Sequence, residues 1–180
     1  MKTPDDVLKF WFDGRGMPDW FGADPAFDAL IAAEFTETYE GLSRGEGWRW
    51  RTTPMHRLAE IIALDQFPRQ LFRGQARAFA TDRMALVLAQ EMVAGGHHQF
   101  LPMPHRMFAL LPYQHAESEA VQAESLRLHT ALGEPEVLKH AEGHAAIIRR
   151  FGRFPKRNAA LNRESTAEEQ AYIASSEGFY

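Results

Sequence analysis

The chain has 180 residues, with 20 Lys and Arg against 24 Asp and Glu, and it contains no cysteine. This length can bury the core of one domain. The absence of cysteine excludes a disulfide scaffold, a Cys-ligated metal site and a catalytic thiol. No apolar run approaches the roughly 20 residues that span a bilayer, and the early acids Asp5 and Asp6 argue against a signal peptide. We therefore expect a cytoplasmic protein with no membrane partner.

The composition predicts an all-α fold. Ala and Leu together number 42, whereas the β-branched residues Val and Ile number 11. Ala and Leu are strong helix formers, and β-branched residues favour strands. No segment shows the sustained alternation of apolar and polar residues that a half-buried strand requires.

Helix starts are marked by capping residues in front of a proline, at Thr3, Asp24 and Thr53. A fourth start is a capping box that begins at Ser165, with Glu168 reaching back to the cap. Together with the spacing of apolar residues, these signals predict helices over residues 4–12, 25–43, 54–65, 82–94, 104–111, 117–132, 135–151 and 166–174.

Two segments of the chain are similar in sequence. Residues 61–69 (IIALDQFPR) and residues 147–156 (IIRRFGRFPK) each have an Ile pair followed by Phe, Pro and a basic residue, and the second has one extra residue. The proline must end or sharply bend the helix in both. Two origins are open: chance recurrence of Phe-Pro in a Phe-rich chain, or duplication of a helix-pair unit. A duplication would divide the single domain, residues 1–180, into related halves of about 1–95 and 96–180.

Charge is strongly segregated along the chain. Residues 1–40 hold nine acidic and three basic residues, whereas residues 145–163 hold six basic residues and no acid. Sixteen of the 20 basic residues are Arg, the side chain that binds carboxylate or phosphate bidentately. This pattern predicts an Arg-rich cleft for an anion, with the candidate ligand-binding residues Arg69, Arg73, Arg153, Arg157, Asn158 and Arg163. The net charge of −4 argues against nucleic acid as the partner.

A structural role is the alternative for these arginines, through pairs with Asp65, Asp82 or Glu168. If the cleft catalyses a reaction instead, the acid–base candidates are His115, Glu117, His144 and Asp65. A buried, hydrogen-bonded state is the other interpretation of His115 and His144.

Metal and cofactor chemistry is not indicated. His140 and His144 are four residues apart, but they lie outside a His-Glu-x-x-His motif, and Gly143 weakens the helix between them. No phosphate-binding or dinucleotide-binding glycine motif occurs. We expect no metal and no cofactor.

Aromatic residues near the N-terminus raise one further alternative. We expect most of Trp11, Phe12, Trp20 and Phe21 in the core. If they form an exposed patch instead, they would mediate a homodimer.

The longer motifs resemble a bacterial family known as domain of unknown function 924. They are residues 7–12 (VLKFWF), 20–21 (WF), 64–69 (LDQFPR), 73–74 (RG), 77–82 (RAFATD), 111–115 (LPYQH) and 150–158 (RFGRFPKRN). The resemblance implies antiparallel helix pairs in a tetratricopeptide-like right-handed superhelical bundle, and it implies no established reaction. Gln114 and Lys156 depart from the family pattern, which tends to have Glu and His there.

Two functions follow from these observations. The first is a binding module that takes an anionic small molecule or a peptide carboxylate in the Arg-rich cleft. The alternative is a small metabolic enzyme that uses His, Asp or Glu for acid–base chemistry in the same cleft.

Overall fold

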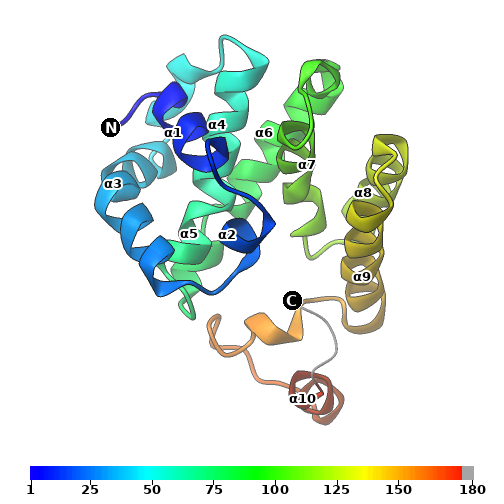
Figure 1. The fold of residues 1–180 in the computed structure, drawn as a ribbon. Coiled ribbons are helices and arrows are strands. Elements are labelled where there is room, and N and C mark those ends of the chain that lie inside the picture. The colour runs from blue at the N-terminus through cyan, green and yellow to red at the C-terminus, as the bar shows by residue number, and fades with distance from the viewer. Residues whose placement is uncertain (176–180) are drawn as a thin grey trace. The chain divides into compact units, whose positions relative to one another are not determined.

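A computed structural model describes residues 1–175, and over that range the chain forms α-helices and short 3-10 helices with no strand (Figure 1). The prediction of an all-α fold is confirmed. The helices group into two compact units. Unit 1 comprises residues 1–73 and 77–109, and unit 2 comprises residues 74–76 and the chain from Leu110 onward. A relationship between two halves that meet near residue 95 stays a prediction.

Unit 1 contains the longer series of helices. In chain order they are α1 (Pro4–Phe12), α2 (Met17–Phe21), α3 (Pro25–Ser43), η1 (Glu46–Trp50), α4 (Pro54–Asp65), α5 (Phe67–Leu71), all but the first residue of η2 (Ala76–Phe79), α6 (Asp82–Ala94), η3 (His97–Phe100) and the first half of α7 (His105–Gln114). The caps at Thr3, Asp24 and Thr53 are confirmed, because each side chain accepts a hydrogen bond from a backbone N–H in the first turn.

The core of unit 1 is built around α4, which packs against α1, α3 and α6. Trp11 and Trp20 are buried, and the indole N–H of Trp20 donates to the carbonyl of Trp11 at 2.7 Å. These two placements are as expected. Phe12 is half-buried, and Phe21, at 52% exposed, is the exception among the four aromatic residues. The reason is that neighbouring residues of a helix point about 100° apart, and α2 turns only Trp20 inward.

Unit 2 is a helical hairpin followed by a C-terminal segment. Helices α8 (Glu119–Leu132) and α9 (Pro135–Phe151) lie side by side (Figure 1). The turn between them uses Gly133 at a φ of +78°, a conformation that glycine adopts without a steric penalty. After α9 come η4 (Pro155–Arg157) and α10 (Ala167–Ala174).

Two details of unit 2 correct the expectations from the sequence. Helix α7 does not end at residue 111 but continues through Pro112 to Gln114. The side-chain amide of Gln122 stabilises the end of this helix. It donates to the carbonyls of Gln114 and Ala116, both at 2.8 Å. A side chain can thus satisfy carbonyls that a helix end leaves open.

The second correction concerns the start of α10. The cap is Thr166 rather than Ser165, and Glu169 rather than Glu168 closes the capping box. The sequence fits both registers, because each Ser or Thr has a Glu three residues later. Contacts outside the helix select the observed one: Glu169 is bound by Arg153.

No helix within residues 1–175 is long and apolar enough to cross a membrane.

Candidate functional site

The site of interest lies in unit 2, where the chain leaves α9. Gly152 ends the helix at a φ of +70°, and Phe154 is then extended, with φ −89° and ψ 105°. Pro155 starts the short helix η4 that carries Arg157. The left-handed turn at glycine lets the chain reverse direction within two residues, and this places the Phe154 ring in a small core with Ile147, Ile148 and Tyr172.

The ring of Phe154 is shared by a basic side chain and an imidazole. The guanidinium carbon of Arg157 lies 4.5 Å from the ring centroid, a cation–π contact. The ring of His144 is perpendicular to that of Phe154, at 5.6 Å between centroids. His115 contacts His144 at 5.9 Å between ring centroids. We call these four residues, His115, His144, Phe154 and Arg157, the Phe154 cluster.

His144 is a neutral imidazole at pH 7. Its ring is buried, and burial lowers its pKa well below the ordinary value of 6.5, with further lowering from His115 and from the charge of Arg157. Its Nδ1 lies 2.8 Å from the carbonyl oxygen of His140. Because a carbonyl only accepts, Nδ1 carries the proton, and Nε2 carries the lone pair.

A second buried histidine of unit 2, His129, was not among the sequence candidates. Its Nδ1 lies 2.8 Å from the carbonyl oxygen of Ser125, and its Nε2 lies 2.7 Å from the side-chain nitrogen of Gln114. Burial lowers the pKa of His129. The sequence carries one signal for this network. Gln122, Ser125 and His129 recur at spacings of three and four, so they form a polar stripe on one helix face.

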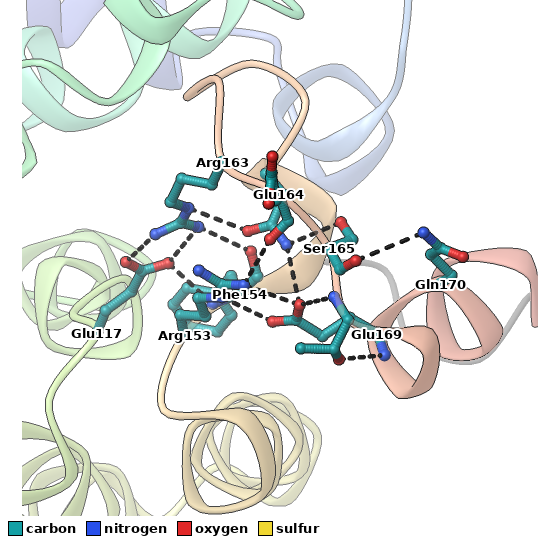
Figure 2. Close-up of polar contacts among 10 residues, drawn as sticks. Glu117, Arg153, Phe154, Arg163, Glu164, Ser165, Glu169 and Gln170 are labelled. Atoms are coloured by element: carbon teal, nitrogen blue, oxygen red, sulfur yellow. Dashed lines mark hydrogen bonds and ion pairs between the residues drawn. The ribbon is translucent and has the colours of Figure 1, made fainter.

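Glu117 joins the segment before α8 to the Phe154 backbone (Figure 2). It accepts the N–H of Phe154 at 2.8 Å and two guanidinium nitrogens of Arg163 at 2.7 and 3.0 Å. Burial alone would raise the pKa of Glu117, but the hydrogen bonds from Arg163 and Phe154 outweigh it and lower that pKa below its ordinary value. Glu117 is therefore an ionised acceptor at neutral pH.

The remaining predicted residues of unit 2 lie in the same network (Figure 2). Arg163 also donates to the side-chain oxygen of Asn158 at 3.0 Å. Arg153 binds both carboxylate oxygens of Glu169, at 2.6 and 2.8 Å. The bond from Arg153 and that from the Thr166 backbone N–H lower the pKa of Glu169 to about 2. These ion pairs tie the C-terminal segment to the end of α9.

The candidates in unit 1 have carboxylate or backbone partners of their own. Arg69 donates to the carbonyl of Asp65, and it lies 3.5 Å from the Asp65 carboxylate and 3.1 Å from that of Asp82. Arg73 binds both oxygens of Asp28 at 2.8 Å. The pairs of Arg69 are those that the structural interpretation predicts. Unit 2 thus contains seven of the ten candidates, His115, Glu117, His144, Arg153, Arg157, Asn158 and Arg163, whereas unit 1 contains Asp65, Arg69 and Arg73.

Among residues 1–175, no group of three or more His, Asp or Glu side chains is placed to hold a metal ion.

Comparison with known proteins identifies the family. A model of the bacterial proteins of unknown function called DUF924 matches residues 7–177. The chain belongs to the DUF924 family. The solved structure of a protein of unknown function from Agrobacterium tumefaciens, ATU0120, is similar to this DUF924 chain. Its sequence identity is 40%, its TM-score is 0.90, and the match covers 95% of this chain and 96% of that one. A search of curated proteins found no match.

In this DUF924 protein the Phe154 cluster combines two kinds of chemistry. Arg157 carries a permanent positive charge, and the N–H groups of its guanidinium suit the oxygen atoms of an anion. His144 is a neutral base whose orientation is fixed by a backbone carbonyl. An anion that contacts Arg157 would therefore lie near an imidazole.

Proposed function

We propose that the protein binds an anionic small molecule, or the carboxylate of a peptide, at the Phe154 cluster. The observation that supports this most directly is the sharing of one phenyl ring by Arg157 and His144, with His115 beside them. A guanidinium that stacks on a ring uses its face for that contact. Its N–H donors lie in its plane, where a carboxylate or phosphate binds bidentately.

The neighbouring carboxylates support the proposal. Glu117 is bound by Arg163, and Glu169 is bound by Arg153. These ion pairs organise the surroundings of the cluster. Because burial keeps His144 neutral, its Nε2 lone pair can accept a hydrogen bond from an N–H or O–H group of the ligand.

The proposed site contains fewer residues than the cleft expected from the sequence. A contribution of Arg69 and Arg73 to the same ligand site stays a prediction, as do a tetratricopeptide-like superhelical arrangement, a homodimer and a cytoplasmic location. We base the proposed function on the residues of unit 2.

A screen of anions by thermal shift tests the binding function. Sulfate, phosphate, citrate and a short peptide with a free C-terminus would be compared with the same peptide carrying an amidated C-terminus. We expect at least one anion to raise the melting temperature of the wild type but not that of Arg157→Ala. Arg150→Ala is the matched control. It removes the same charge from unit 2, at an exposed ion pair with Glu168, and should behave like wild type. Equal responses of both variants would refute the proposal.

The enzyme interpretation has one specific observation in its favour. The hydrogen bond from His144 Nδ1 to the carbonyl of His140 leaves Nε2 as the basic atom, and a lowered pKa keeps it unprotonated. To test this, the stabilising anion would be incubated with the protein and followed by NMR. Chemical conversion that His144→Gln abolishes would identify an enzyme. An unchanged ligand would favour the binding module.

A further inference from the structure

Both backbone polar groups of Phe154 are held by one pair of side chains. Its N–H donates to Glu117 at 2.8 Å, and its carbonyl accepts from Arg163 at 3.1 Å. Glu117 and Arg163 bind each other through two hydrogen bonds of 2.7 and 3.0 Å (Figure 2). We call this arrangement the Glu117–Arg163 clamp.

The clamp controls where the Phe154 ring points. A side chain leaves the backbone along a direction that the two flanking peptide planes determine, and both planes are held here. The ring is the surface on which Arg157 lies and which His144 contacts. The backbone N–H of Arg157 also donates to the Phe154 carbonyl, at 3.0 Å. A change at the clamp must therefore move the ring, the guanidinium, or both.

We propose that Glu117 and Arg163 are positioning residues, which hold the Phe154 platform so that the guanidinium of Arg157 is oriented toward the anion. This inference rests on the proposed anion site. It gives different roles to two residues that the sequence suggested as a catalytic acid and as a ligand contact. Glu117 acts as an ionised acceptor, and Arg163 acts through Phe154. Neither touches the anion.

For the substitution Glu117→Gln, a positioning role and simple electrostatics predict opposite changes in anion affinity. Removing the negative charge of Glu117 next to an anion site should strengthen anion binding if only charge matters. The clamp predicts weaker binding. In Glu117→Gln the new amide N–H₂ must face either the guanidinium of Arg163 or the N–H of Phe154, so one side of the clamp opens because two donors oppose each other.

The experiment is a sulfate titration at pH 7 and low ionic strength, followed by NMR. Sulfate is fully ionised at this pH, so protonation of the probe does not contribute. Glu117→Gln should bind sulfate about tenfold more weakly than wild type, of the order seen when supporting contacts of a site are lost. Glu168→Gln is the matched control, because it removes the same charge at the exposed Arg150 pair. It should bind as wild type does. Tighter or equal binding by Glu117→Gln would overturn the inference.

Arg163→Lys provides a second variant that keeps the charge. Lysine is a single-point donor and cannot bridge Glu117, Asn158 and the Phe154 carbonyl as the guanidinium does. We expect weaker sulfate binding in this variant too. The imidazole resonances of His144 should move in both clamp variants without any ligand, because the ring current of Phe154 changes. Unmoved resonances and unchanged binding in a folded Arg163→Lys would contradict the clamp, even if Glu117→Gln fails to fold.

The test separates the two proposals. If wild type and Arg157→Ala respond to sulfate identically, the proposed function fails and the role of the clamp in binding fails with it. If wild type binds sulfate, Arg157→Ala does not, and both clamp variants bind normally, the anion site stands and the positioning role is wrong.

Discussion

The two Phe-Pro segments are alike in sequence and different in structure. In unit 1, helix α4 ends at Asp65 and α5 begins at Phe67, so the chain stays helical on both sides of Gln66. Phe67 is fully buried, and Arg69 folds back onto Asp65 and Asp82. In unit 2, Gly152 ends α9, Phe154 is extended, and Arg157 stacks on the Phe154 ring.

The extra residue of the second segment and its Gly152 account for much of this difference. In the first segment, the Phe-Pro pair follows within two residues of the helix end and starts a new helix at once. In the second, the left-handed turn at Gly152 reverses the chain before the proline. The same motif therefore supports a structural arginine in unit 1 and, in our proposal, an arginine of the binding site in unit 2.

Removal of the unit 1 arginine should have the largest effect on stability. Arg69→Ala leaves the buried Asp65 carboxylate without its charged partner, and breaking such a pair costs about 3–5 kcal/mol. Arg157→Ala should lower the free energy of unfolding by less, because the cation–π contact with Phe154 that it removes is worth about 0.5–1 kcal/mol. Urea denaturation of both variants measures this difference. Equal losses would show that the two arginines have the same structural role.

The two phenylalanines should separate stability from binding. Phe67→Leu and Phe154→Leu each truncate a side chain that is almost wholly buried, and each should cost about 1–2 kcal/mol. Only Phe154→Leu should weaken sulfate binding, since Phe67 belongs to the core of unit 1. Denaturation and a sulfate titration on the same samples would show this. If Phe67→Leu, in which Phe154 is intact, also weakened sulfate binding, the two phenylalanines would not have the different roles described here.

Acid should destabilise the protein through the buried histidines of unit 2. The pKa of His144 lies well below 6.5 in the folded state. Between that folded pKa and 6.5 the unfolded chain binds a proton that the folded chain does not, so stability falls as the pH falls through this window. Each such proton contributes a slope of about 1.4 kcal/mol per pH unit.

His144→Gln should therefore flatten the decrease of stability between pH 6.5 and pH 5. Part of the slope should remain, because burial also lowers the pKa of His129. Urea denaturation at a series of pH values tests this. If the wild type and His144→Gln have parallel profiles, the folded protein does not keep His144 neutral.

The smallest predicted effect distinguishes the two capping registers of α10. Thr166→Ala should cost about 1 kcal/mol, because Thr166 accepts the N–H of Glu169 at 3.2 Å. Ser165→Ala should cost less, since Ser165 is not the cap. A larger loss for Ser165→Ala in thermal denaturation would support the register expected from the sequence.

Much of the fold could be predicted because its signals are local. Proline after a capping residue located the starts of α1, α3 and α4 at their observed positions. The short helices α2 and α5 were missed, because five residues hold too little of a helical period to be recognised. The capping register at Thr166 was missed for another reason: a distant residue, Arg153, decides it.

The candidate site was only partly visible in the sequence. The residue types of the Phe154 cluster were suggested by Arg richness and by histidines that titrate near neutrality. The sequence also placed these histidines in one cleft with Arg157, but it could not show that they meet at the Phe154 ring, because that geometry depends on the turn at Gly152 and on Glu117, which lies 37 residues before Phe154. The pairing of Arg69 with Asp65 was one of two interpretations, and a sequence cannot choose between a paired and a ligand-binding guanidinium.

The most direct test of the account is a sulfate titration monitored through the imidazole resonances of His115 and His144. It would compare wild type, Arg157→Ala and Arg73→Ala. Arg73 binds Asp28 in unit 1, so its removal is the matched loss of one positive charge. We predict that sulfate shifts these resonances in wild type and in Arg73→Ala, and that it leaves them unmoved in Arg157→Ala. Resonances that shift equally in Arg157→Ala would contradict an anion site at the Phe154 cluster.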